Sequence, residues 1–167
     1  MAAGATYEPI ATTTLGSAAA SITFSSISAA YTDLRVVLAN AKVSALASVR
    51  LTYNSNATGY SFTQIKGNGT AAGSDFSSNN TYIDLLQGVY LDTTIPGFIA
   101  IDVFSYAGST YKTCLINSNI DWNGSGAVIR EVGLWQNTAA ITSLTITTSS
   151  GTLNTGTTAT LYGILKA

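Results

Sequence analysis

The sequence contains no histidine, and its only cysteine is Cys114. The lack of histidine removes the commonest general base, the commonest zinc ligand and the usual partner of a nucleophilic serine. A single cysteine cannot form a disulfide within the chain. Only oxygen ligands remain for a metal ion, and no run of acidic residues resembles a calcium-binding loop.

Charged residues are also scarce. Seven basic and eight acidic side chains make up 9% of the chain, whereas ordinary soluble domains carry about 25%. They occur singly along the sequence, so no basic cluster is present that could neutralise a row of phosphates or an anionic membrane surface. We therefore expect neither nucleic acid nor a membrane as a partner.

Long apolar runs and an N-terminal leader are missing as well. The longest apolar stretches, such as residues 95–104, are interrupted by Pro96, Gly97 and Asp102 and are too short for a membrane-spanning helix. The first residues, MAAGATYEP, contain neither the basic nor the apolar part of a signal peptide. The sequence thus predicts no secretory signal.

What the chain does contain is typical of a folded domain. Hydrophobic residues make up 46% and aromatic residues 10% of the 167 residues, while 19 Ser and 25 Thr take the place of charge. A chain of 17.2 kDa buries roughly two thirds of the surface of its unfolded form, which is enough for one core. We expect a single folded domain with a surface of hydroxyls and amides.

Alternation of apolar and polar residues predicts β-strands. In residues 34–38, Leu34, Val36 and Leu38 share one face, and residues 49–53 repeat the pattern. Residues 98–106 are apolar on both parities, so we expect this strand to be covered on both faces. The other predicted strands are 22–27, 60–63, 82–91, 111–120, 128–135, 141–148 and 158–165.

Nine or ten short strands separated by turn residues indicate an all-β protein. We predict an antiparallel β-sandwich that resembles a jelly roll, with extra edge strands and an extended N-terminal segment. Residues 1–20 are expected to form an N-terminal arm or an edge segment, and residues 21–167 the single sandwich domain. Residues 67–80 (GNGTAAGSDFSSNN) are low in complexity and are predicted to be a long exposed loop.

Paired carboxylates are a catalytic device that the composition permits, since they can hydrolyse glycosides. The acids considered for such a pair are Asp84, Asp92, Asp102, Asp121 and Glu131. Asp102 interrupts an apolar strand, and it either faces solvent or an interface, meets Arg130 across strands, or acts as a general acid in a groove. The structural interpretations are favoured, so we expect no catalytic residues, no metal, no cofactor and no enzymatic activity.

Aromatic residues suggest a different kind of site. Trp122 stands between Asp121 and Asn123 ahead of a glycine turn, where a ring can stack on a sugar. The competing interpretation is that Trp122 packs under a loop and that Trp135 belongs to the core. Glycan binding therefore remains an alternative, with Trp122 and Tyr82 as its candidate contacts.

Several phrases of the sequence resemble small virion proteins of tailed bacteriophages, including phages of cyanobacteria. They are YEPIATTT (7–14), YTDLRV (31–36), YAGST (106–110), GLW (133–135) and ATLYGI (159–164). The resemblance runs from about Tyr7 to Ile164, and its phrases diagnose no reaction. It implies a structural protein of the virion, of the head-decoration or fibre-associated kind, made in the host cytoplasm.

Under this resemblance the first expectation is a capsid decoration or cement protein on the outside of the head. Its partners would be the major capsid protein and other virion proteins, and it would form a homo-oligomer, for instance a trimer. The expected contacts with the shell or a neighbouring subunit are Tyr7, Glu8, Pro9, Ile10, Thr12 and Thr14. A surface with few charges suits such contacts because few ions must be desolvated. The alternative is a fibre or tail domain that binds a host glycan through Trp122 and Tyr82.

Overall fold

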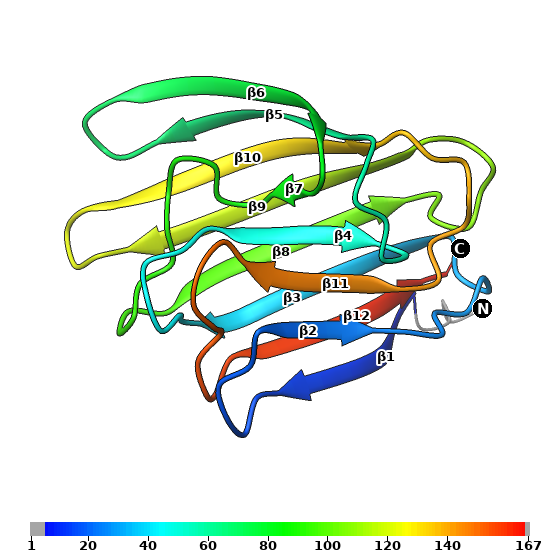
Figure 1. The fold of residues 1–167 in the computed structure, drawn as a ribbon, viewed down its shortest axis with the longest axis horizontal. Coiled ribbons are helices and arrows are strands. Elements are labelled where there is room, and N and C mark those ends of the chain that lie inside the picture. The colour runs from blue at the N-terminus through cyan, green and yellow to red at the C-terminus, as the bar shows by residue number, and fades with distance from the viewer. Residues whose placement is uncertain (1–5, 166–167) are drawn as a thin grey trace.

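Figure 1 shows the computed structural model, which describes residues 6–165. These residues form twelve strands: β1 (Tyr7–Thr14), β2 (Ser21–Phe24), β3 (Asp33–Ala41), β4 (Val49–Tyr53), β5 (Tyr60–Gly67), β6 (Ala72–Asn80), β7 (Ile83–Asp84), β8 (Gly97–Phe104), β9 (Lys112–Asp121), β10 (Gly126–Trp135), β11 (Leu144–Thr148) and β12 (Thr158–Ile164). No helix in this part of the chain is long and apolar enough to cross a membrane.

The strands form two antiparallel sheets that pack as a sandwich. The large sheet has the order β1-β12-β3-β8-β9-β10-β5-β6, and the small sheet has the order β2-β11-β4-β7. Strands β1, β2, β3, β4, β7, β8, β11 and β12 alternate between the two sheets along the chain, except that β4 and β7 both belong to the small sheet. In space they give β1-β12-β3-β8 facing β2-β11-β4-β7, which is the strand order of a jelly roll. The predicted all-β, jelly-roll-like sandwich is confirmed.

Two hairpins are added to this jelly roll. The β5–β6 hairpin follows β4, the β9–β10 hairpin follows β8, and both extend the large sheet beyond β8 (Figure 1). The β9–β10 turn contains Asn123 and Gly124 at φ values of 61° and 100°. Positive φ at both central residues matches the right-handed twist of the flanking strands, and Asn-Gly accepts it readily. As a result, β6 forms one edge of the large sheet and β1 the other.

The core lies between the sheets and follows the predicted alternation. Leu34, Val36 and Leu38 of β3 are buried, and every second residue of β8 and β9 joins them. An aromatic cluster of Tyr53, Tyr60 and Trp135 connects β4 of the small sheet to β5 and β10 of the large sheet. The Tyr53 backbone N–H donates to the Tyr60 hydroxyl at 2.8 Å, which connects the two sheets.

Three of the local predictions are wrong. Residues 72–80, expected to be a loop, form strand β6. Backbone pairing with β5 holds them in this strand, and their small polar side chains give no sign of it in the sequence. Residues 82–91 contain only the two-residue strand β7, which is followed by a turn in which Leu85 and Leu86 are buried. In β8, Ala100 is buried on the second face, but Phe98 and Phe104 are 39% and 43% exposed there, so this strand is not covered on both faces.

The N-terminal segment lies along the edge of the large sheet. Residues 7–14 pair with β12 from Tyr7–Ile164 to Thr14–Thr158, with a bulge between Pro9 and Ala11. Residues 1–5 of the expected N-terminal segment, and residues 166–167 of the expected domain, lie outside the described residues.

Lys112 provides a test of how the loops are held. Its side chain is 1% exposed, and its Nζ donates to the carbonyl oxygens of Gly108 at 2.6 Å, Thr138 at 3.3 Å and Thr110. We expect Lys112→Met to lower the free energy of unfolding by about 2–3 kcal/mol, because carbonyls in two loops lose a charged donor. Urea unfolding followed by circular dichroism measures this loss. Lys42→Met is the control, and equal effects of the two substitutions would contradict the assigned role.

Candidate functional site: the outer face of the large sheet

The large sheet has an outer face that the small sheet does not cover. Cross-strand register places one row of side chains on it from Tyr162 through Arg35, Asp102 and Leu115 to Val132, and the row continues to Thr63 and Phe76. Large apolar side chains stand exposed on this face, namely Ile65, Phe76, Phe98, Phe104, Val128 and Val132. We call this surface the outer face. Its combination of apolar groups and few charges makes it the candidate functional site.

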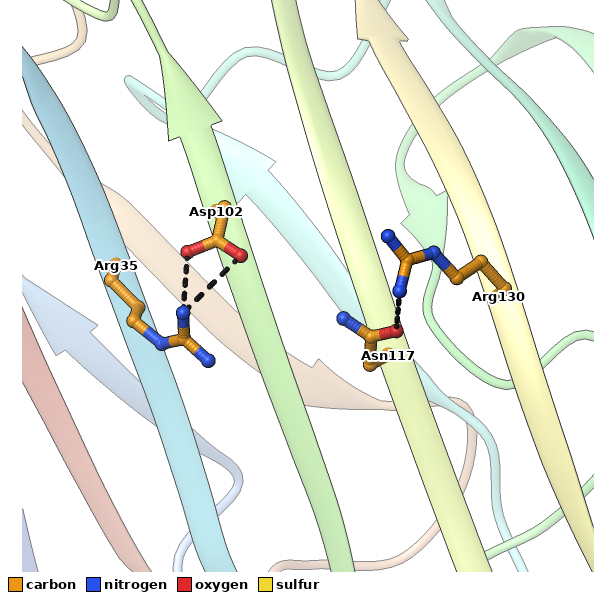
Figure 2. A network of polar contacts seen from close by, with 4 residues as sticks. All are labelled: Arg35, Asp102, Asn117 and Arg130. Carbon is orange, nitrogen blue, oxygen red and sulfur yellow. Dashed lines mark hydrogen bonds and ion pairs between the residues drawn. The ribbon is translucent and has the colours of Figure 1, made fainter.

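Charges on the outer face are paired or bonded within the sheet (Figure 2). Arg35 Nη1 contacts the two carboxylate oxygens of Asp102 at 3.1 and 3.5 Å, from β3 to β8. Arg130 Nη1 donates to Asn117 Oδ1 at 2.8 Å, from β10 to β9. The predicted contact of Asp102 with Arg130 is wrong. Strand β9 lies between β8 and β10, and Arg35 of β3 is the residue directly opposite Asp102.

The β1 end of the outer face contains four of the six predicted contact residues. Tyr7, Pro9, Thr12 and Thr14 share the face with their β12 partners, and Tyr7 is 51% exposed. Thr12 Oγ1 donates to Thr160 Oγ1 at 3.2 Å, and the hydroxyls of Thr14 and Thr158 lie 2.9 Å apart. This end therefore presents hydroxyl groups without charge.

The other two predicted contacts are placed differently. Ile10 occupies the bulge of β1 and packs against the core. Glu8 lies opposite Gly163, on the parity that faces the small sheet, and it is half-buried. The structure thus brings four of the six residues together on one surface and turns two away.

At the opposite end, β5, β6 and β10 enclose a shallow hollow of about 580 Å³ on the outer face. Its lining includes the apolar residues Ile65 and Val128 and the small residues Gly67 and Ala72. Arg130 and Lys66 are the ionisable residues of the lining. A hollow of this composition can accept a side chain of a partner, and its lining contains no carboxyl group, histidine or cysteine.

The carboxyl groups considered for glycoside hydrolysis are spread over the molecule. Asp92 Oδ1 accepts from the backbone N–H of Thr94 and Ile95, and Asp121 Oδ1 accepts from that of Gly124, so both stabilise turns. Hydrogen bonds from Thr94 and Ile95 lower the pKa of Asp92. Asp84 and Glu131 are buried between the sheets at 7% and 1% exposure, where a polysaccharide has no access.

Burial controls the protonation of these two inner acids. Loss of solvation, reinforced by the charge of Asp84, raises the pKa of Glu131 to about 9. Desolvation also raises the pKa of Asp84, although Asp84 accepts hydrogen bonds from Leu86 N–H and Ser48 Oγ. Glu131 is therefore neutral at pH 7.

The candidate glycan contacts are both engaged elsewhere. Trp122 lies in the β9–β10 turn and packs, partly buried, against the core. Tyr82 lies between β6 and β7, and the Arg50 guanidinium carbon stands 4.2 Å from the centre of its ring. A cation already occupies one face of that ring, so a sugar could stack only on the other.

No family model, no curated protein and no solved structure matches this chain. Within residues 6–165, no three His, Cys, Asp or Glu side chains gather in a way that could hold a metal ion.

The sequence interpretation missed most of the outer face. Ile65, Val128 and Val132 are apolar residues at positions of β5 and β10 where the alternation predicts polar ones, and this was the available signal, although Ile65 lies beyond the predicted strand 60–63. Phe76 lies in the segment predicted to be a loop, although one large apolar residue among small polar ones is unusual there. The buried pair Glu131 and Gln64 could not be recognised, since their proximity depends on the register of β5 against β10.

Proposed function

We propose that this protein is a non-enzymatic structural protein of a tailed-phage virion, a capsid decoration protein that binds the major capsid protein on the outside of the head. Its copies form a homo-oligomer, and its role is mechanical. Many weak contacts, summed over many copies, oppose the pressure of packaged DNA. The resemblance of the sequence to small virion proteins motivates this assignment.

The outer face is the observation that carries the proposal. Six large apolar side chains stand exposed on it, while Arg35 and Asp102 neutralise one another. Such a surface loses little solvation of charge when another protein covers it. Exposed apolar patches on folded domains typically mark contact sites for other proteins.

The β1 end of the outer face is assigned to the capsid. The hydroxyls of Thr12 and Thr160, with Tyr7 and Pro9 beside them, offer an uncharged surface along one sheet edge. Pro9 and the adjacent bulge limit strand addition at this edge, so the contact is made by side chains of the face rather than by backbone pairing.

Introduced charge tests this contact. We expect the double substitution Thr12→Lys and Thr160→Lys to weaken binding to heads that lack the protein by at least about tenfold, because two ammonium groups would lose solvation in the contact. Thr23 and Thr145 form an equivalent hydroxyl pair at 3.1 Å on the small sheet. The same double Lys substitution there is the matched control, with binding unchanged. Equal loss in both variants would contradict the assignment of the β1 end.

Labelling of intact particles tests the virion assignment itself. Gold-labelled antibody against the recombinant protein should decorate the head in a regular pattern. Label confined to the tail or fibre tips would replace decoration by host recognition, and Trp122→Ala would then be expected to reduce adsorption to cells. Particles without label would refute both functions.

A further inference from the structure

Two hairpin turns of the large sheet border another hollow. Val128 of β10 pairs with Gly67 of β5, and the β9–β10 and β5–β6 turns lie at the same end of the sheet (Figure 1). The hollow between these turns measures about 380 Å³, which is within the range of binding sites for small molecules. We call it the turn hollow. The side chains of its polar lining are exposed, and they are those of Asn68, Asn119, Asp121 and Ser125.

Two polar groups of the turn hollow are held in fixed orientations. Asn68 Oδ1 accepts hydrogen bonds from the Ala71 N–H at 2.8 Å and from the N–H and hydroxyl of Thr70 at 3.0 Å. The oxygen is therefore used in the turn, and the amide NH₂ group is the part that remains to donate to a ligand. Asp121 Oδ1 accepts from the Gly124 N–H at 3.1 Å, so within the described chain Oδ2 is the oxygen that remains to accept. The hollow thus combines an oriented donor with an oriented acceptor.

Apolar groups stand beside these polar ones on the outer face. Cross-strand register places Asn119 directly between Phe98 of β8 and Val128 of β10. The Phe98 side chain is 39% exposed, and Val128 lines the hollow. An exposed aromatic ring beside amide and carboxylate groups suits a saccharide, because the hydroxyls of a sugar take hydrogen bonds while its C–H face packs on the ring.

The charge of the turn hollow distinguishes between classes of saccharide. Among the residues that line it, Asp121 is the one ionisable side chain, and there is no Lys or Arg. A sugar that carries a carboxylate, sulfate or phosphate group would find no cation in the lining and would be repelled by Asp121. A sugar without charge meets only groups that bond to hydroxyls. The hollow therefore favours a neutral ligand.

We propose that the turn hollow binds a neutral hexose. Asp121 Oδ2 accepts from a hydroxyl of the sugar, the Asn68 amide donates to another, and Asn119 bonds to a third. Phe98 packs against the C–H face of the ring. Because the turns hold the Asn68 and Asp121 groups in place before the sugar arrives, little side-chain entropy is lost on binding.

This saccharide site is separate from the contacts considered above. Neither Trp122 nor Tyr82, the contacts predicted from the sequence, lines the turn hollow. The β1 end, which is assigned to the capsid, lies at the opposite edge of the large sheet, beyond β3 and β12. One copy can therefore contact the capsid and a saccharide at the same time. The inference depends on the lining of the hollow and does not rest on the virion assignment.

Nuclear magnetic resonance of the purified, ¹⁵N-labelled full-length chain with D-glucose, D-galactose and D-mannose tests this proposal without phage particles. With at least one of these sugars we expect the side-chain amide signals of Asn68 and Asn119 to shift, with a Kd on the order of 1 mM. Glucuronate, the acidic counterpart of glucose, should bind more weakly than the neutral sugar because Asp121 repels it. Absence of a shift with all three sugars overturns the proposal, and equal binding of glucuronate overturns the preference for a neutral ligand.

Matched substitutions check the position of the site. Asn119→Ala should weaken binding by about fivefold or more, because one hydrogen bond to the sugar is lost. Asn117→Ala is its control, since Asn117 lies on the same face of β9 but does not line the turn hollow. Phe98→Ala should likewise weaken binding, whereas Phe104→Ala, on the same face of β8 and 43% exposed, should not. Equal losses within either pair contradict the site. The pattern of shifts in the native chain keeps the test decisive if a variant does not fold.

Discussion

Replacing Glu131 with Gln is expected to raise the free energy of unfolding at pH 7 by roughly 1–3 kcal/mol and to flatten its dependence on pH. Glu131 is 1% exposed, and neither of its carboxyl oxygens has a hydrogen-bond partner within residues 6–165. Its cross-strand neighbour Gln64 has a buried Oε1 that also lacks a donor in this part of the chain. A neutral carboxylic acid or an amide can donate to such an oxygen, whereas a carboxylate cannot.

The sign of the pH dependence follows from the protons bound in each state. The folded chain holds the Glu131 proton up to a pKa of about 9, while an unfolded glutamate releases it near 4.5. Between these values unfolding releases a proton, so the stability of the protein falls as pH rises. From pH 4.5 to 7 this amounts to about 3 kcal/mol at 1.36 kcal/mol per pH unit. The raised pKa of Asp84 acts in the same direction, and attraction by Arg50 opposes it.

Urea unfolding between pH 5 and 9 measures this effect. The other glutamate of the chain, Glu8, lies half-buried on β1, and Glu8→Gln is the matched control with an expected change below about 0.5 kcal/mol. A Glu131→Gln variant that is less stable than the native chain at pH 8, or that keeps the native slope, would show that Glu131 is ionised and paired in the folded state.

Replacing Trp135 with Ala is expected to lower the free energy of unfolding by about 3–5 kcal/mol. Trp135 is 1% exposed, and its ring stacks on Tyr60 at 6.0 Å and contacts Tyr53 at 5.6 Å between ring centres. Tyr53 belongs to the small sheet and Tyr60 to the large one, so removal of the indole leaves a cavity where the two sheets meet.

Urea unfolding followed by far-ultraviolet circular dichroism measures this loss. Tyr111→Ala is the control, because that ring is 55% exposed and its removal should change stability by less than about 0.5 kcal/mol. A loss below about 1 kcal/mol for Trp135→Ala would mean that the neighbouring rings close the cavity. The cluster would then contribute little to holding the sheets together.

The outer face shows where prediction from the sequence succeeded and where it stopped. Period-two alternation predicts β3, β4, β9 and β10, because every second residue of a strand with one buried face is apolar. Strand β6 has no buried face of that kind, since the small sheet does not cover it and its residues are exposed or half-buried. A segment held only by backbone bonds to β5 resembles a loop in sequence, and the sequence therefore predicts a loop at Phe76.

Contacts between residues distant in the chain could not be predicted from the sequence for a related reason. Asp102 could be recognised as unusual, but its partner depends on which strand lies beside β8. Arg35, 67 residues earlier, occupies that place because β3 and β8 are neighbours in the jelly roll. The same holds for Glu131 and Gln64, whose contact requires the β5–β6 hairpin to be added beside β10.

The sequence by itself determined the all-β class, the sandwich, most of the core residues and the scarcity of charge, because these depend on composition and local alternation. The tertiary structure decided which edges are open, which residues share the outer face, and which carboxyl groups are buried. These properties arise from strand order and register, which bring together residues separated by up to the length of the chain. No local pattern records them.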